Sequence, residues 1–428
     1  MGCTSIKKTK PLNTKRQERK LSNTTLDIME DFKEVHQQYE YKKSLGYGRY
    51  GHVFLAECPK TRQQVAVKAL SKFDTSISKL IEEVEILAEL DHPNIVKYYK
   101  HCYSNKYLYI IMEYCEGEEL FSEILKHGKF TEEETLVLME KLARAVSHCH
   151  QLGIIHCDLK PENIMISPEG NLKVIDFGLS MRLDSSVYQG IAGTPFYIAP
   201  EIITQGLYTK AYDMWSLGIT MHTMLTGYLP ISGKDFDEIS ERIKNYTGPS
   251  FTSTKWKKVS PEAKDLLKRL LEPNYSARIT VEEVLEHKWF VENKKETLLC
   301  GSAILEALQR YSEFSEIKKN MLTFIVRNVS DIELKEYQRT FLETDKAKTG
   351  LITSKDLEAA LSKAENKVSR KELEELTRKI NQRGRDSISY SEFVAALIAT
   401  RIREFLTEER LTSVFKLVEQ AEVQKREI

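Results

Sequence analysis

The sequence lacks the features that hold secreted or membrane-spanning proteins together. Its seven cysteines are an odd number at scattered positions and form no CxxC pair, which argues against a disulfide framework and a cysteine-rich metal site. The most apolar stretch, 107–112, is far shorter than the roughly 20 residues that a bilayer span needs. No apolar region follows the N-terminal charges, as a signal peptide requires. We therefore expect a cytoplasmic protein in a reducing environment.

No excess of charge of one sign points to a nucleic acid partner, because 63 basic residues balance 63 acidic ones. With 428 residues, 41% of them hydrophobic, the chain can bury one large two-lobed domain and a smaller second one. The balance fails only near the N-terminus, where seven basic residues stand against the single acid Glu18 in the first twenty positions. We expect residues 1–38 to be a basic, disordered segment, since it has little to bury.

Three regions with different residue patterns follow one another along the rest of the chain. Alternating apolar and polar residues with glycine turns come first, interrupted by one helical period at 77–90. A helix-rich stretch follows Glu119, and helices rich in Glu and Lys run from 291 to 428. The expected strands are 41–45, 51–57, 64–70 and 107–113. The expected helices of the region after Glu119 are 120–126, 132–152, 213–226, 235–245, 261–271 and 281–289.

The first motif that carries chemistry is a glycine-rich turn between two expected strands. Residues 45–53 read LGYGRYGHV and fit GxGxxGxV, in which glycines let the backbone lie against phosphate oxygens. Alone the pattern is weak evidence, but VAVK follows at hairpin distance and places Lys68 on the third strand, against the α- and β-phosphates. The nucleotide-binding residues predicted here are Leu45, Gly46, Gly48, Gly51, Val53, Ala66 and Lys68.

A second motif lies at residues 156–163, which read HCDLKPEN, with Asp176-Phe177-Gly178 thirteen positions later. At this spacing Asp158 can orient a hydroxyl nucleophile, while Asn163 and Asp176 can hold magnesium. With these motifs in order, residues 39–290 resemble a eukaryotic protein kinase. The resemblance implies a domain that binds ATP and Mg²⁺, with Asp158 as the catalytic base and Asn163 and Asp176 as metal ligands.

The resemblance assigns further roles. Lys160, in the DLKPEN form typical of serine/threonine kinases, would neutralise charge on the γ-phosphate. Glu83 would pair with Lys68, and we prefer it to Glu82 and Glu85 because it lies nine residues before His92, as in similar kinases. The other implied roles are the gatekeeper Met112, the hinge residues Glu113 and Cys115, a ribose contact at Glu119, recognition of a basic residue upstream of the substrate hydroxyl by Glu162, the acceptor site at Thr194, a structural ion pair of Glu201 with Arg278, and a structural Asp213. For Glu119 and Glu162, a solvent-exposed or helix-capping position is the alternative.

Cys157 departs from the kinase pattern, since most kinases have arginine at this position. That arginine orders the activation loop by pairing with a phosphorylated residue, which a cysteine cannot do. Ser185, Ser186 and Tyr188 would be the candidate phosphosites. We therefore expect the loop to be active without phosphorylation; the alternative is a neutral substitution compensated by Arg182 or another cation.

The last module carries two loops with calcium-loop spacing. Residues 345–356 keep glycine at position six and isoleucine at position eight, but Ala347 stands at position three and the loop ends on an aspartate rather than a bidentate glutamate. Residues 381–392 keep the final glutamate but have Arg383 and Arg385 where carboxylates should point. A third entering helix at 407–418 has no complete loop after it. We expect weak calcium chemistry at most, with Asp345, Thr349, Thr353 and Asp356 as the candidates.

Taken together, the chain resembles the calcium-dependent protein kinases of plants and protists. The resemblance implies an α+β, two-lobed protein kinase fold followed by an all-α EF-hand-like domain, with boundaries at 39–290 for the kinase, 291–330 for a junction and 331–428 for the EF-hand-like domain. In that family the junction helix blocks the cleft until calcium withdraws it. Here residues 312–329 have one apolar face, which fits either autoinhibition or ordinary packing. The face consists of Phe314, Ile317, Met321, Phe324, Ile325 and Val329.

The N-terminus begins Met1-Gly2-Cys3 followed by lysines, and so resembles a dually acylated anchor with myristate on Gly2 and palmitate on Cys3. The usual motif has serine or threonine at position six, where this chain has Ile6, so a basic tail without lipid is the alternative. Lipidation would bring the protein to the inner membrane leaflet.

The sequence therefore predicts a serine/threonine kinase that transfers the ATP γ-phosphate to protein hydroxyls, with magnesium as cofactor and calcium left open. We expect protein substrates, no nucleic acid partner and a monomer. A pseudokinase scaffold is the first alternative, but Lys68, Glu83, Asp158, Asn163 and Asp176 are all present. A calcium-sensing adaptor is the second, and Ala347, Arg383 and Arg385 disfavour it.

Overall fold

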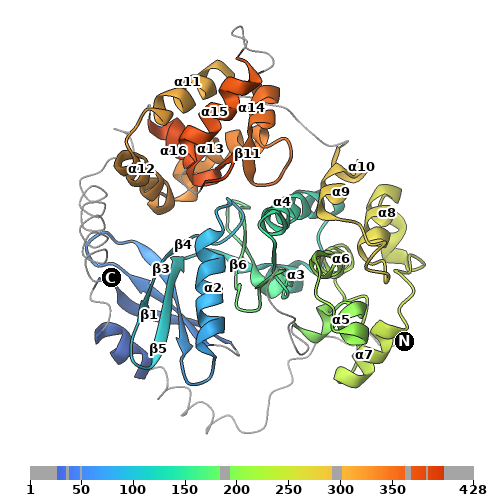
Figure 1. Ribbon diagram of the computed structural model, residues 1–428. Coiled ribbons are helices and arrows are strands. Elements are labelled where there is room, and N and C mark those ends of the chain that lie inside the picture. Colours follow the sequence, from blue (N-terminus) through green and yellow to red (C-terminus); the bar gives the residue numbers. More distant parts are fainter. Residues whose placement is uncertain are drawn as a thin grey trace. The chain divides into compact units, whose positions relative to one another are not determined.

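The computed structural model describes residues 27–34, 38–48, 51–183, 193–291, 301–361, 368–381 and 384–399. The chain forms two compact units (Figure 1). The first comprises residues up to Val84 together with Tyr99–Tyr114, and the second comprises Glu85–Tyr98 and the residues from Cys115 onward. Helix α2 (Ile77–Glu89) begins in the first unit and ends in the second.

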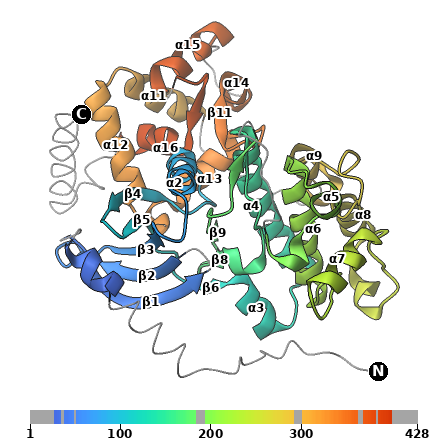
Figure 2. The same cartoon turned by 60° about the horizontal axis from the view of Figure 1, so that its bottom comes forward.

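A five-stranded sheet in the order β1-β2-β3-β5-β4 forms the first unit (Figure 2). Neighbouring strands from β1 to β5 in this order pair antiparallel. The predicted strand 51–57 is confirmed to the residue, whereas the edge strand β4 was missed because half-buried, mostly polar residues show no clear alternation. The strands are β1 (Glu40–Gly48), β2 (Gly51–Glu57), β3 (Gln64–Ser71), β4 (Tyr98–Tyr103) and β5 (Tyr107–Glu113).

A short helix at residues 27–34 packs on this sheet, although we expected disorder over residues 1–38. Ile28 and Phe32 are buried in one cluster with Phe54 and Tyr109. The Phe32 ring lies 5.1 Å from that of Phe54 and 5.0 Å from that of Tyr109. Tyr109 also donates a 2.7 Å hydrogen bond to Asp31. Two apolar side chains one helical turn apart therefore order this part of a mostly polar segment.

Helices dominate the part of the second unit that follows Cys115. Helix α4 begins with a capping box of Thr131 and Glu134, and α6 is buried along nearly its whole length. Short two- and three-stranded sheets lie among them in the orders β10-β7 and β6-β8-β9. The helices are α3 (Leu120–His127), α4 (Glu132–Gln151), α5 (Pro200–Gln205), α6 (Lys210–Thr226), α7 (Phe236–Lys244), α8 (Pro261–Leu270), α9 (Val281–Glu286) and α10 (Lys288–Val291), and the strands are β6 (Glu118–Glu119), β7 (Ile154–Ile155), β8 (Ile164–Ile166), β9 (Leu172–Val174) and β10 (Met181–Arg182).

Between residues 301 and 399, the described part of the chain forms a helical module with two helix–loop–helix pairs preceded by two further helices, which we call the EF-hand module. Its loops are joined by the antiparallel strands β11 and β12, in which Ile352 lies opposite Ile388. Both isoleucines are fully buried. The elements are α11 (Gly301–Ser312), α12 (Glu316–Asn328), α13 (Asp331–Thr344), β11 (Leu351–Thr353), α14 (Ser354–Leu361), α15 (Arg370–Ile380), β12 (Ser387–Ser389) and α16 (Tyr390–Ala399).

The predicted junction at 312–329 forms helix α12, which packs into this module. Ile325 and Val329 are buried in its core, and Phe314, Met321 and Phe324 pack against that core, while Ile317 is exposed. Within the described residues, most of the apolar face is therefore covered by packing inside the module. A search of the described helices found none long and apolar enough to span a bilayer.

Candidate active site

The predicted base, Asp158, is held by three side chains in the second unit. Lys160 Nζ donates to Asp158 Oδ2 at 2.6 Å, and Thr194 Oγ1 donates to Asp158 Oδ1 at 2.7 Å. Asn163 Nδ2 donates to the Asp158 backbone carbonyl at 2.8 Å and to its carboxylate at 3.0 Å. Lys160 also donates to Thr194 at 2.7 Å. These contacts fix the direction of the carboxylate, which a positioned base needs.

The loop that carries Asp158 is held in place by hydrogen bonds to the carboxylate of Asp213. Asp213 is fully buried and accepts hydrogen bonds from the amides of His156 (3.0 Å) and Cys157 (3.1 Å) and from His150 Nε2 (2.9 Å). Burial alone would raise the pKa of Asp213, but the His150 contact and the neighbouring histidine charges hold it below its usual value. The structure thus gives Asp213 the structural place that we predicted, whereas its contact with His150 was not predicted.

Cys157 is buried and has a φ of 64°, in the left-handed region that non-glycine residues rarely adopt. Two contacts accompany this conformation, since the Asp213 carboxylate accepts from the Cys157 amide and Gly193 lies against the Cys157 carbonyl. A Cβ on Gly193 would lie 2.1 Å from the Tyr212 hydroxyl, so only glycine fits before Thr194. The candidate phosphosites Ser185, Ser186 and Tyr188 lie outside the described residues. Arg182, the candidate compensating cation, forms an ion pair with Glu89.

Asn163 and Asp176 meet the requirements for magnesium ligands. The Asn163 amide nitrogen is used by Asp158, so its carbonyl oxygen is the atom left for a metal. Asp176 is exposed and has a φ of 60°, while Phe177 beside it is buried with its ring 4.7 Å from that of His156. One aspartate and one asparagine oxygen suit Mg²⁺, which takes its remaining ligands from water and phosphate.

The first unit supplies the phosphate-binding lysine. Lys68 on β3 forms a 2.6 Å ion pair with Glu83 on α2, and both side chains are buried. Glu83 is thus the partner among the three acidic candidates on this helix, and no such contact is described for Glu82. The pair fixes the ammonium group, as transfer of a phosphoryl in similar enzymes requires.

The glycine-rich turn and the sheet beneath it fit a nucleotide. A Cβ on Gly51 would lie 2.2 Å from the Ala69 carbonyl, whereas one on Gly46 would meet nothing within 4 Å, so Gly46 leaves open space for a ligand. Val53 lies opposite Lys68, and Ala66 lies opposite the buried Met112. Leu45 and Gly48 lie on β1, Glu113 ends β5, and Cys115 is half-buried.

Two acidic residues lie near Lys160. Glu119 is exposed, which is the alternative considered above, but partial burial of its carboxyl and then the charge of Glu118 raise its pKa. Burial is also the main cause that raises the pKa of Glu162, with smaller contributions from Glu119 and Asp158. Glu119 is the N-cap residue of α3, but its side chain makes no capping hydrogen bond. An arrangement of carboxylates that are costly to ionise favours a cationic ligand.

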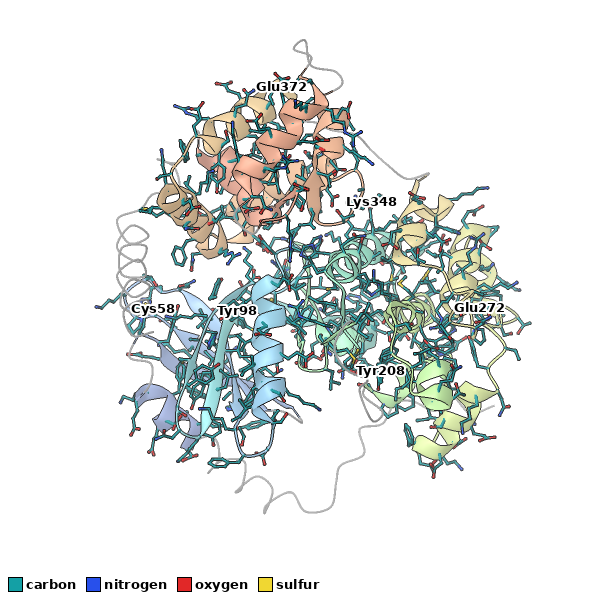
Figure 3. The ribbon with its side chains drawn as sticks, in the orientation of Figure 1. Cys58, Tyr98, Tyr208, Glu272, Lys348 and Glu372 are labelled. Carbon is teal, nitrogen blue, oxygen red and sulfur yellow. The ribbon has the colours of Figure 1, made fainter. Side chains whose placement is uncertain are left out.

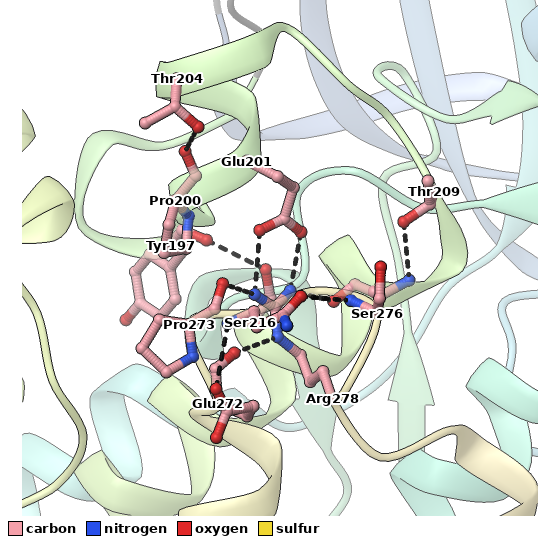
Figure 4. Close-up of polar contacts among 12 residues, drawn as sticks. Tyr197, Pro200, Glu201, Thr204, Thr209, Ser216, Glu272, Pro273, Ser276 and Arg278 are labelled. Atoms are coloured by element: carbon pink, nitrogen blue, oxygen red, sulfur yellow. Dashed lines mark hydrogen bonds and ion pairs between the residues drawn. The ribbon is translucent and has the colours of Figure 1, made fainter.

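Glu201 and Arg278 form the predicted buried ion pair (Figure 4). The guanidinium group binds both carboxylate oxygens, at 2.7 and 2.9 Å. It also donates to the carbonyls of Ala211 at 2.7 Å and Glu272 at 2.8 Å, and lies 5.1 Å from the Trp215 ring centroid. Such bidentate geometry compensates the loss of hydration of both charges.

Hydrogen bonds between residues of the first predicted calcium loop stabilise the conformation of that loop. Asp345 accepts from the amides of Thr349 (3.0 Å) and Gly350 (2.7 Å), and burial raises its pKa to about 6. Asp356 accepts from the amides of Ala347 (3.0 Å) and Thr353 (2.9 Å), and also from the Thr353 hydroxyl at 2.5 Å. The loop therefore keeps its shape, but a set of two aspartates without carboxylates at positions three and five is a poor fit for calcium.

The second loop keeps Glu392, which accepts from the Ser389 amide at 2.8 Å. Asn381 stands at position one and accepts from the Arg385 amide at 3.0 Å. Arg385 itself forms an ion pair with Glu89. Arg383 and the predicted helix 407–418 lie outside the described residues, as do Gly2 and Cys3.

Comparison with known proteins agrees with this geometry. The family model described as a protein kinase domain matches residues 39–290, and an EF-hand domain pair matches residues 335–398. The chain is 34% identical over 394 residues to "Calcium-dependent protein kinase 5" of Plasmodium berghei (strain Anka), covering 90% of this chain and 69% of that protein. It is 31% identical over 393 residues to "Calcium-dependent protein kinase 7" of Arabidopsis thaliana, covering 90% and 73%. It thus spans about two thirds of the P. berghei protein and nearly three quarters of the A. thaliana protein.

Proposed function

Because this chain belongs to the calcium-dependent protein kinase family, we propose a role for each of its site residues in phosphoryl transfer. The chain is a protein serine/threonine kinase that uses ATP and Mg²⁺ and carries an EF-hand pair. Asp158 accepts the proton of the substrate hydroxyl, and Lys160 neutralises charge on the transferred group. Lys68, oriented by Glu83, binds the α- and β-phosphates. Asn163 and Asp176 would hold magnesium, which would supply positive charge to the phosphate oxygens.

The convergence of Lys160, Thr194 and Asn163 on Asp158 carries this assignment. An Asp158→Asn variant keeps the shape but cannot take a proton, so we expect kcat for peptide phosphorylation to fall by about 10²- to 10⁴-fold. Asp237→Asn, an exposed position on α7, is the matched control and should retain full activity. Equal activity of Asp158→Asn and wild type would refute the base assignment. A wild-type protein that transfers no phosphoryl would instead favour the scaffold alternative.

The substrate is proposed to carry a basic residue upstream of the acceptor hydroxyl, with Glu162 as its contact. The raised pKa values of Glu162 and Glu119 support this preference, since a bound cation offsets the cost of ionising them. An arginine-bearing peptide should therefore be phosphorylated better than its alanine counterpart. Equal kcat/KM for the two peptides would exclude the preference.

Activation is proposed to need no phosphorylation of Ser185 or Ser186. Cys157 supports this proposal, since it is buried, neutral and engaged through its amide with Asp213. Arg182 is engaged by Glu89, so the compensating cation considered above already has a partner. The double variant Ser185→Ala/Ser186→Ala should keep wild-type activity, and a large loss would refute the idea.

We further propose that the protein is a monomer held at the inner membrane leaflet by acylation of Gly2 and Cys3. Two acyl chains hold a protein at a bilayer, while one alone binds marginally. The Gly2→Ala variant should move from the membrane fraction to the soluble fraction of cells. Unchanged partition would remove the anchor from the proposal.

A further inference from the structure

Within the second unit, the two EF-hand loops contact α2, α4 and α9. Arg385, at position five of the second loop, forms an ion pair with Glu89. Lys348, labelled in Figure 3, is a buried residue of the first loop and donates to the carbonyl of Leu285. His148 Nδ1 lies 3.3 Å from the carbonyl of Thr349. Both loops are thus part of an interface rather than open ion sites.

Gly350 shows how closely the first loop packs. A Cβ at this position would lie 2.5 Å from His148 Nδ1 and 2.7 Å from His92 Cδ2. The glycine also has a φ of 70°, which the loop turn requires. Glycine therefore serves both the turn and the contact, and any side chain would force the loop away from α4 and the segment after α2.

Two helices of the module add polar contacts to the same segment. Asp331 of α13 pairs with Lys97 at 2.9 Å and with Lys173 at 2.8 Å. Burial opposes ionisation of Asp331, but the two lysines hold its pKa well below the usual value. The amide and hydroxyl of Ser391 donate to Asp91 at 3.0 and 2.6 Å. A buried, doubly paired carboxylate is costly to separate from its partners.

Several of these contacts lie at the C-terminal end of α2 or in the segment that follows it. Glu89 is the last residue of α2, and Asp91 and Lys97 lie in the segment that follows this helix. The same helix carries Glu83, which pairs with Lys68. Glu89 also binds Arg182 of β10, which lies between Asp176 and the candidate phosphosite Ser185 in the chain. Because Glu89 ends α2 and Asp91 follows it closely, contacts of the module with these two residues restrain the end of the helix that carries Glu83.

We infer that the EF-hand module is a calcium-independent clamp on the C-terminal end of α2, with Arg385 and Ser391 as positioning residues for the kinase reaction. Arg385 occupies a ligand position of the calcium loop and replaces ion binding with an intramolecular ion pair. The clamp keeps α2 in the orientation in which Glu83 meets Lys68. This inference rests on the proposed kinase function.

The test uses the full-length protein in chelator. Arg385→Glu places two acids against each other, so amide hydrogen exchange in residues 85–98 should become about tenfold faster or more. Peptide phosphorylation should fall by about three- to tenfold, and added calcium should change neither quantity in the wild type. Arg378→Glu, an exposed residue of the same module paired with Asp386, should match the wild type in both measurements.

If amide hydrogen exchange in residues 85–98 is as slow in Arg385→Glu as in the wild type, the clamp is refuted. Faster exchange in this variant with unchanged or raised kinase activity would also refute it. Ser391→Ala removes one hydrogen bond to Asp91 and should also make exchange in residues 85–98 faster. This second variant keeps the test decisive if Arg385→Glu disturbs the fold of the module itself. Asp158→Asn separates the two claims, because it should abolish phosphorylation and leave exchange at 85–98 unchanged. A wild type without kinase activity would refute the proposed function, and the exchange measurements would still decide docking.

Discussion

The loop around Asp158 and the calcium loops of this chain differ in how much of the family's residue pattern they keep. Lys160 and Asn163 both donate hydrogen bonds to Asp158, and Asp176 is present in the sequence. In the calcium loops, Ala347 and Arg385 stand at ligand positions. The first region keeps the residue types that phosphoryl transfer needs, while the second keeps its fold without the full set of acidic residues that calcium prefers.

The difference shows that a loop can keep its shape after it has lost its ligands. Gly350 and the β11–β12 pairing of Ile352 with Ile388 fix the loop geometry through backbone conformation and burial. Ion binding instead depends on carboxylates at particular positions. Fold and ligand chemistry are therefore separable here, and variants can test them one at a time.

The largest effect is expected on stability, at the buried ion pair of Glu201 with Arg278. Arg278→Met leaves Glu201 buried without its partner, which should lower the free energy of unfolding of the helical lobe by about 3–5 kcal/mol. Arg269→Met, which removes an exposed pair with Asp265, is the control and should cost under ~1 kcal/mol. Denaturant unfolding followed by tryptophan fluorescence measures both. Similar losses in the two variants would contradict the importance of the buried pair.

The next effect falls on catalysis. Glu83→Gln removes the charge that orients Lys68, so kcat should fall by about 10- to 100-fold. Glu82→Gln changes the neighbouring residue on the same helix and should leave kcat within about twofold. If both variants lose activity equally, the effect belongs to the helix as a whole and not to the pair.

Local patterns predicted most of the kinase part, because its motifs and helical periods lie within short stretches of sequence. The choice of Glu83 was correct for the ion pair, and β2 was predicted to the residue. The helix at 27–34 was missed because eight residues with three apolar side chains give little periodic signal. The contact of Arg385 with Glu89 joins residues 296 positions apart, so no local pattern could reveal it. Arg385 could be recognised only as an unsuitable calcium ligand.

A smaller effect is expected on substrate preference and its dependence on pH. As pH falls through the raised pKa of Glu162, its carboxylate is neutralised and its attraction for an arginine is lost. The ratio of kcat/KM for arginine- and alanine-bearing peptides should therefore decrease toward acidic pH by about threefold to tenfold. In Glu162→Gln the ratio should be low and independent of pH. A wild-type ratio that rises on acidification would contradict the role of Glu162.

The smallest effect is expected for calcium itself. Kinase activity should change less than about twofold between chelator and excess calcium, because positions three and five of both loops lack carboxylates. The variant Ala347→Asp/Thr349→Asp/Asp356→Glu restores acidic ligands to the first loop and should bind calcium measurably by calorimetry. A strong calcium-dependent rise in wild-type activity would show that the loops still act as a switch. A calcium-binding variant with unchanged kinase activity would instead show that ion binding and clamping of α2 are separate properties of the module.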